Sequence, residues 1–191
     1  HSLAPSLRTY DLRAGRHRLF YAEAFNQDIG DWKVSAVTNM RGMISGAKVF
    51  NQDIGKWDVT KVTSMYGMFS GAKVFNENIG EWDVSAVTET SSMFTDAWAF
   101  NQDISKWDVT EVSGPLVEGQ LWGMNSMFSG AKAFNQNLAT WCERDGLAKT
   151  DMFTGSACAV SSCGLNGNDE PACPPISNSA ALRKAVIAWI E

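Results

Sequence analysis

Residues 50–74 read FNQDIGKWDVTKVTSMYGMFSGAKV, and units of this kind recur along much of the chain. The Phe-Asn pair that opens each unit begins at residues 25, 50, 75, 100 and 134. The last gap is 34 residues where the others are 25, so the fourth unit contains an insertion of nine residues. A unit of this length cannot bury both of its faces alone. The repeat therefore predicts stacked coils that share one continuous core.

The spacing of apolar residues within a unit predicts its local structure. Residues 40, 43, 44, 47 and 50 follow the i, i+3, i+4, i+7 pattern of one helical face, whereas Trp32 and Val34 alternate as in a short strand. Thr38 precedes the helical pattern as an N-cap would, and Gly46 follows it as a C-cap would. We therefore predict an α/β fold with a short strand and a short helix in each coil.

An asparagine follows the opening phenylalanine in every unit. These residues are Asn26, Asn51, Asn76, Asn101 and Asn135. Buried N–H and C=O groups of turns need hydrogen-bond partners. We therefore expect an inward-facing ladder of amides that bond to the turn backbone of their own coil and of the next one.

The repeat resembles that of the BspA-like leucine-rich-repeat surface proteins, also described as Mycoplasma lipoprotein repeats of unknown function, over residues 25–158. The resemblance implies a right-handed solenoid of leucine-rich-repeat type with five coils. It also implies a secreted or surface location, adhesive or protein-binding roles, and no catalytic residues. The chain departs from the pattern at the insertion, at Thr90 where most coils have Met, and in the degenerate fifth coil, which we expect to be a terminal cap.

The two flanks are expected to close the ends of the stack. Residues 1–24 are predicted to form an N-terminal cap or a partial repeat. Because the chain begins at His1 rather than at Met, we take it as a processed or truncated form, and further repeats before His1 stay open. Residues 159–191 are predicted to form a Cys-containing loop and a C-terminal helix. That helix would cover the last coil or dock on a partner through Trp189.

All four cysteines lie in the last third of the chain: Cys142, Cys158, Cys163 and Cys173. Their spacing lacks the Cys-x2-Cys pairs or histidine partners of a zinc site, so we predict two disulfides and an oxidising compartment. Three pairings are possible. We favour Cys142 with Cys158, which closes within the fifth coil, and Cys163 with Cys173, which would hold the Gly- and Pro-rich loop between them.

Composition and motifs exclude several functions. The chain has 191 residues, 45% hydrophobic residues and a formal net charge of −5, with no run of 18 apolar residues and no basic cluster. We therefore expect neither a transmembrane segment nor nucleic-acid binding. His17, the single internal histidine, has no catalytic motif around it, so we expect no enzyme and no cofactor. Recurring aspartates such as Asp28 and Asp53 could bind calcium, but asparagine replaces them in two coils, and we expect no metal site.

The insertion at residues 114–122 is the strongest functional lead. It brings Leu116, Val117, Leu121 and Trp122, which no other coil needs, so the loop either binds a partner or folds back over the coil beneath it. We expect a non-enzymatic interaction scaffold that binds a protein through the solenoid face and this loop. It would be extracellular, at the cell surface or in another oxidising lumen. A bridging structural subunit and a glycan-binding adhesion module are the alternatives.

Overall fold

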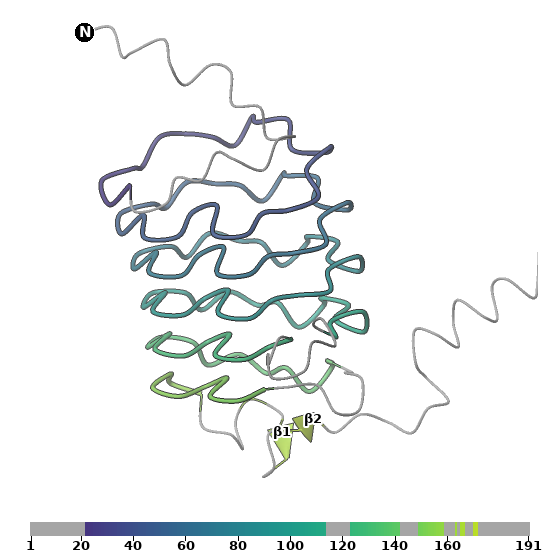
Figure 1. Ribbon diagram of the computed structural model, residues 1–191. Coiled ribbons are helices and arrows are strands. Elements are labelled where there is room, and N and C mark those ends of the chain that lie inside the picture. The colour runs from purple at the N-terminus through teal and green to yellow at the C-terminus, as the bar shows by residue number, and fades with distance from the viewer. Residues whose placement is uncertain are drawn as a thin grey trace, which may run out of the picture.

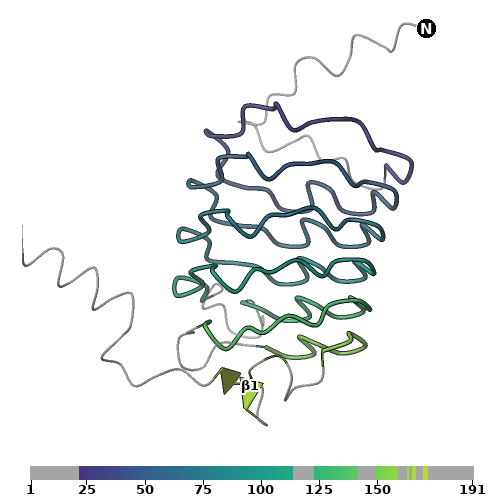
Figure 2. The same cartoon turned by 180° about the vertical axis from the view of Figure 1, so that it is seen from behind.

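The computed structural model describes residues 22–113, 123–141, 149–158, 163, 165–166 and 170–171. Figures 1 and 2 show these residues as a stack of flattened coils, each lying against the next. Beyond the stack, strand β1 (Leu165–Asn166) pairs antiparallel with strand β2 (Glu170–Pro171). The repeat along the sequence is therefore a repeat in space.

The predicted α/β fold is wrong. The described part of the chain contains no helix, and its strand structure is limited to β1, β2 and isolated bridge residues, which include the parallel bridges Asn39 to Ser64 and Ser64 to Glu89. The leucine-rich-repeat solenoid implied by the resemblance, with a helix and a strand in each coil, is therefore not what these residues form. The predicted C-terminal helix and most of the N-terminal cap lie outside the described residues.

Each coil makes two consecutive β-turns where a helix was predicted. In the first coil, residues 40–43 and 44–47 each close a turn with a backbone hydrogen bond of 3.1 Å. The third residues of these turns, Gly42 and Gly46, have φ angles of 61° and 76°, as a type II turn requires. Both turns begin and end on buried residues, so they produce the i, i+3, i+4, i+7 spacing of a helical face without forming one.

The backbone groups that the turns leave unpaired bond to the neighbouring coil. Phe69 N–H donates to the carbonyl of Met93 at 2.9 Å, and Gly71 N–H donates to that of Thr95 at 2.7 Å. Equivalent bonds join the other coils along this side of the stack. They use the donors that a helix would have used internally, and they hold successive coils in one register.

The core is a continuous set of stacked side chains. The ring of Phe75 lies 5.9 Å from that of Phe50 and 6.1 Å from that of Phe100, measured between centroids. Trp57, Trp82, Trp107 and Trp141, which occupy the same position in successive coils, are also buried. The indole N–H of Trp57 donates to the carbonyl of Ile29 in the preceding coil at 3.1 Å. The interior is thus packed along the stack axis as well as within each coil.

Candidate functional site

Several of the predicted functional residues lie outside the described part of the chain. These are the loop residues Leu116, Val117, Leu121 and Trp122, together with Trp189, Cys142 and Cys173. The predictions that rest on them stay predictions.

The asparagines form one line along the stack. Asn26 Oδ1 accepts a hydrogen bond from Asn51 N–H at 2.9 Å, and Asn51 Oδ1 accepts one from Asn76 N–H at 2.7 Å. The same bond continues to Asn101 and Asn135, at 2.8 and 2.9 Å. These side chains are exposed or half-buried, not inward-facing as expected. Each side-chain amide links its own coil to the backbone of the next coil, so these asparagines stabilise the stack.

The recurring aspartates shape turns. Asp28 Oδ1 accepts from Gly30 N–H at 3.0 Å, and Asn78 Oδ1 accepts from Gly80 N–H at the same distance. Because aspartate and asparagine make the same bond, the turn requires the oxygen and not the charge. Among the described residues, no three His, Cys, Asp or Glu side chains converge as metal ligands.

The disulfide joins Cys158 to Cys163, with their Cα atoms 5.9 Å apart. The favoured pairing of Cys158 with Cys142 and of Cys163 with Cys173 is therefore wrong. Both bonded cysteines are buried, and the carbonyl of Cys163 accepts from Leu138 N–H at 2.9 Å. Cys163 thus lies against the fifth coil, and this contact could not be read from sequence spacing.

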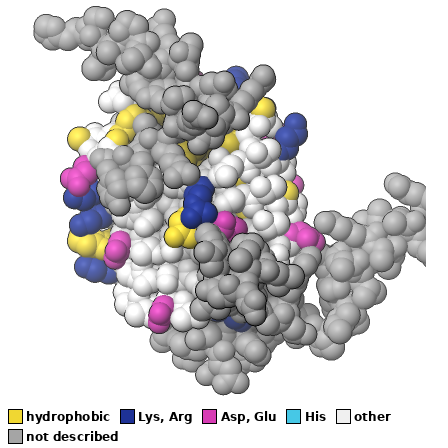
Figure 3. All heavy atoms as spheres, viewed as in Figure 1, with side chains coloured by type: hydrophobic (Ala, Val, Ile, Leu, Met, Phe, Trp, Pro, Cys, Tyr) yellow, Lys and Arg dark blue, Asp and Glu magenta, His cyan; other side chains and the backbone are white. Residues whose placement is uncertain are grey.

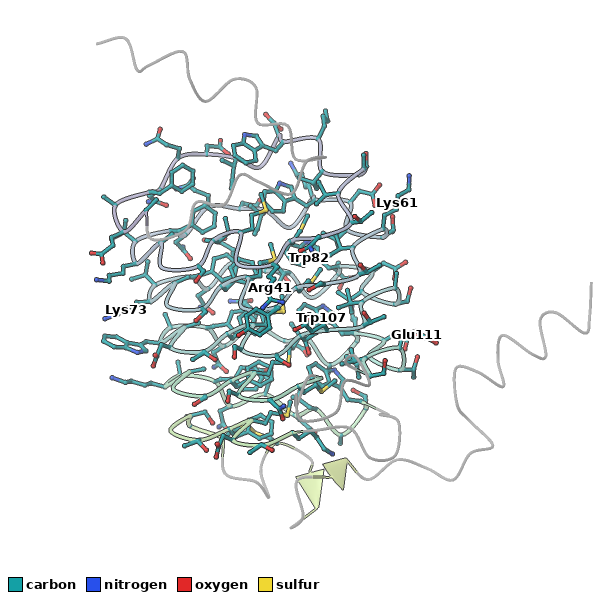
Figure 4. All side chains as sticks on the ribbon, viewed as in Figure 1. Arg41, Lys61, Lys73, Trp82, Trp107 and Glu111 are labelled. Carbon is teal, nitrogen blue, oxygen red and sulfur yellow. A yellow bond between two sulfur atoms is a disulfide. The ribbon has the colours of Figure 1, made fainter. Side chains whose placement is uncertain are left out.

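A surface that we call the lysine–tryptophan edge consists of Lys48, Lys73, Trp98 and Lys132, with Val49 and Val74 beside them. Each of the four named first stands two residues before the opening phenylalanine of the next unit. Figure 4 places Lys73 on the side of the stack opposite Lys61 and Glu111. Figure 3 shows basic side chains along that side with a hydrophobic side chain among them.

Trp98 lies at the centre of this edge and is 38% exposed. Lys73 Nζ lies 3.7 Å from the centroid of its ring, and Lys132 Nζ lies 3.9 Å from it. The two lysines come from the coils on either side, so the ring is held between two ammonium groups by cation–π attraction. Lys48 forms an ion pair with Glu23 at 2.6 Å, whereas none of the ion pairs between described residues involves Lys73 or Lys132.

The sequence analysis did not predict this edge, because it considered mainly the repeat positions that are apolar in every unit. The available signal was a departure from the repeat: the third unit has Trp98 where the neighbouring units have lysine. Only the stacking of the coils shows that these lysines flank the tryptophan.

A cluster of Glu89, Ser64 and Arg41 lies on the side of the stack where the parallel bridges are. Glu89 is 8% exposed, and its Oε2 accepts a hydrogen bond from Ser64 Oγ at 3.1 Å and lies 3.9 Å from the Arg41 guanidinium. The other oxygen, Oε1, accepts no hydrogen bond from any residue that the structure describes. Burial raises the pKa of Glu89 above its ordinary value, and Ser64 and Arg41 only partly oppose this rise.

We expect Glu89→Gln to change how stability depends on pH. Because the pKa of Glu89 is raised in the folded chain, its protonated form stabilises the fold, and this contribution is lost as the pH rises through the folded pKa. The variant should therefore gain stability over the wild type as the pH increases through that window and hold the gain above it. Urea unfolding of both proteins across the window measures the difference.

Ser64→Ala is the matched control. Ser64→Ala removes the hydrogen bond that lowers the pKa of Glu89, so this pKa should rise further. In the Ser64→Ala background, the stability gained by Glu89→Gln should therefore keep increasing to higher pH. A stability gain from Glu89→Gln that does not change with pH would contradict the raised pKa of Glu89.

No helix in the described residues is long and apolar enough to cross a bilayer.

Comparison with known proteins places the chain in a family. No curated protein and no solved structure matches the chain. The family model described as "Mycoplasma protein of unknown function, DUF285" matches residues 16–115 and 118–162, which include all five coils. The chain therefore belongs to this Mycoplasma-type repeat family.

Proposed function

We propose that the chain is a non-enzymatic interaction scaffold that binds a protein partner through the lysine–tryptophan edge. The observation that supports this most is the exposure of Trp98, at 38%, beside Val49 and Val74, each 45% exposed. These three are the exposed large hydrophobic residues of the described chain. Apolar groups gathered on one exposed edge, with charges among them, are typical of protein interfaces.

The stack suits this task because it holds the edge in place. Backbone hydrogen bonds join the coils at this edge: Ala99 N–H donates to the carbonyl of Lys73, and Ala133 N–H donates to that of Trp98, both at 3.0 Å. An edge held in this way loses little conformational freedom when a partner binds. Tryptophan is also one of the residues that most often contribute a large share of the binding energy of a protein interface.

We place the scaffold outside the cell, at the cell surface or in another oxidising lumen. The disulfide between Cys158 and Cys163 supports an oxidising compartment, where such bonds persist. The resemblance of the repeat to BspA-like surface proteins supports the same location.

Site-specific photo-crosslinking tests the proposal. A photoreactive phenylalanine analogue replaces Val49 of the edge, which keeps Trp98 and its two lysines, and replaces Lys61, on the side of the stack opposite Lys73, in the control. After irradiation in an extract of the source cells, we expect one discrete protein adduct from position 49 and none from position 61. No adduct at position 49, or the same adducts from both positions, would contradict the proposal.

A further inference from the structure

We propose that the lysine–tryptophan edge recognises an extended acidic segment of its protein partner that runs along the stack axis. This inference rests on the proposed function and adds the chemistry of the partner. It starts from Lys73 and Lys132, whose ammonium groups face opposite sides of one ring and enter no ion pair among the described residues. Their charge is available to a ligand although the whole chain has a net charge of −5.

The position of the cations favours an extended ligand. The two ammonium nitrogens, each held near one face of the Trp98 ring, are at most about 8 Å apart. Side chains on one face of an extended peptide recur about every 6.6 Å, two residues of about 3.3 Å each. Carboxylates at positions i and i+2 of such a peptide can therefore approach Lys73 and Lys132 together.

The valines extend the site along the stack. Val49 and Val74 directly follow Lys48 and Lys73 in the two preceding coils, and each is 45% exposed. Lys48 already pairs with Glu23, so this end of the edge offers apolar surface more than free charge. The complementary segment therefore has apolar residues on the same face as its carboxylates, at the end that lies over the first two coils.

The edge is less suited to an acidic polysaccharide. Sugars bind tryptophan by stacking on the face of the ring, and lysine ammonium groups occupy the Trp98 ring on both sides. A sugar would also leave the branched side chains of Val49 and Val74 without apolar contacts. A protein segment can offer carboxylates to Lys73 and Lys132 and apolar side chains to Val49 and Val74.

Peptide binding tests this inference on the full chain. The probe is a synthetic peptide, Leu-Thr-Leu-Thr-Glu-Thr-Glu, with capped ends, and the control peptide has lysine in place of both glutamates. We expect the glutamate peptide to bind the wild type at least ten-fold more tightly, with an affinity that falls as salt is added. The variant Lys73→Glu/Lys132→Glu should reverse this preference. The matched variant Lys56→Glu/Lys61→Glu has the same net charge and should keep it.

The possible failures can be told apart. Equal binding of both peptides, or loss of preference in both double variants, would overturn the acidic-segment inference. Binding of alginate or heparin without binding of the glutamate peptide would overturn it in favour of a polysaccharide. A crosslinked protein at position 49 that persists in Lys73→Glu/Lys132→Glu would overturn the inference and leave the proposed function standing. The absence of any adduct at position 49 would remove the proposed function itself. The circular dichroism spectrum of each variant shows whether the fold is kept.

Discussion

Replacing Phe94 with alanine is expected to lower the free energy of unfolding by about 3–5 kcal/mol. Phe94 is fully buried, and its ring lies 3.9 Å from that of Phe100, centroid to centroid, and 5.5 Å from those of Phe69 and Phe128 in the neighbouring coils. The substitution leaves a cavity in the middle of the stack. Neighbouring coils cannot collapse into it, because their hydrogen bonds fix their spacing. Urea unfolding followed by tryptophan fluorescence measures the loss.

Trp98→Ala is the control for Phe94→Ala. It also removes an aromatic side chain from the same coil, but an exposed one whose measurable contacts are with two lysines. Cation–π attraction at an exposed site contributes about 0.5–1 kcal/mol for each lysine. A loss for Phe94→Ala no larger than that for Trp98→Ala would contradict the stacked core.

Gly71→Ala is expected to destabilise the fold by about 1–2 kcal/mol, because Gly71 has a φ angle of 72° and an L-residue is strained there. The opposite sign follows if residues 65–72 form a helix, since alanine replacing a helical glycine stabilises by up to about 1 kcal/mol. An added Cβ would lie 3.6 Å from Gly46 Cα, an ordinary contact, so the effect comes from the backbone angle. Thermal and urea unfolding report the sign directly.

Gly71→Asn provides the comparison for this substitution. Asparagine tolerates the left-handed region better than alanine does, so the asparagine variant should lose less stability. The third coil supports this expectation, because Asp96 occupies the equivalent turn position with a φ angle of 55°. If both variants were more stable than the wild type, the turn assignment would be wrong.

The repeat indicated which side chains are buried, because a position that is apolar in every coil can face only the shared interior. Ile54, Trp57 and Val59 show this, with at most 4% of each exposed. The same pattern could not distinguish a helix from two consecutive turns, since both bury residues at i, i+3, i+4 and i+7. The deciding feature is the glycine four residues after another, at Gly67 and Gly71, where a positive φ angle prevents a helix.

The candidate binding surface was much harder to predict than the core. Its lysines stand at exposed or half-buried positions outside the apolar core, and Trp98 occurs at this repeat position in one coil only. The arrangement of Lys73, Trp98 and Lys132 depends on the register between coils, which long-range backbone hydrogen bonds determine. The pairing of Cys158 with Cys163 likewise depends on how the chain leaves the fifth coil. Local sequence patterns contain neither kind of information.

The fold and the lysine–tryptophan edge both depend on one claim, that N–H groups such as that of Phe69 bond to the next coil and not to the carbonyl four residues earlier, as they would in an α-helix. Scalar couplings across hydrogen bonds, measured by NMR on isotope-labelled protein, test this most directly. We predict a coupling between the amide nitrogen of Phe69 and the carbonyl carbon of Met93, whose hydrogen bond is 2.9 Å long. A coupling from Phe69 to the carbonyl carbon of Met65, the partner in an α-helix, would contradict the account.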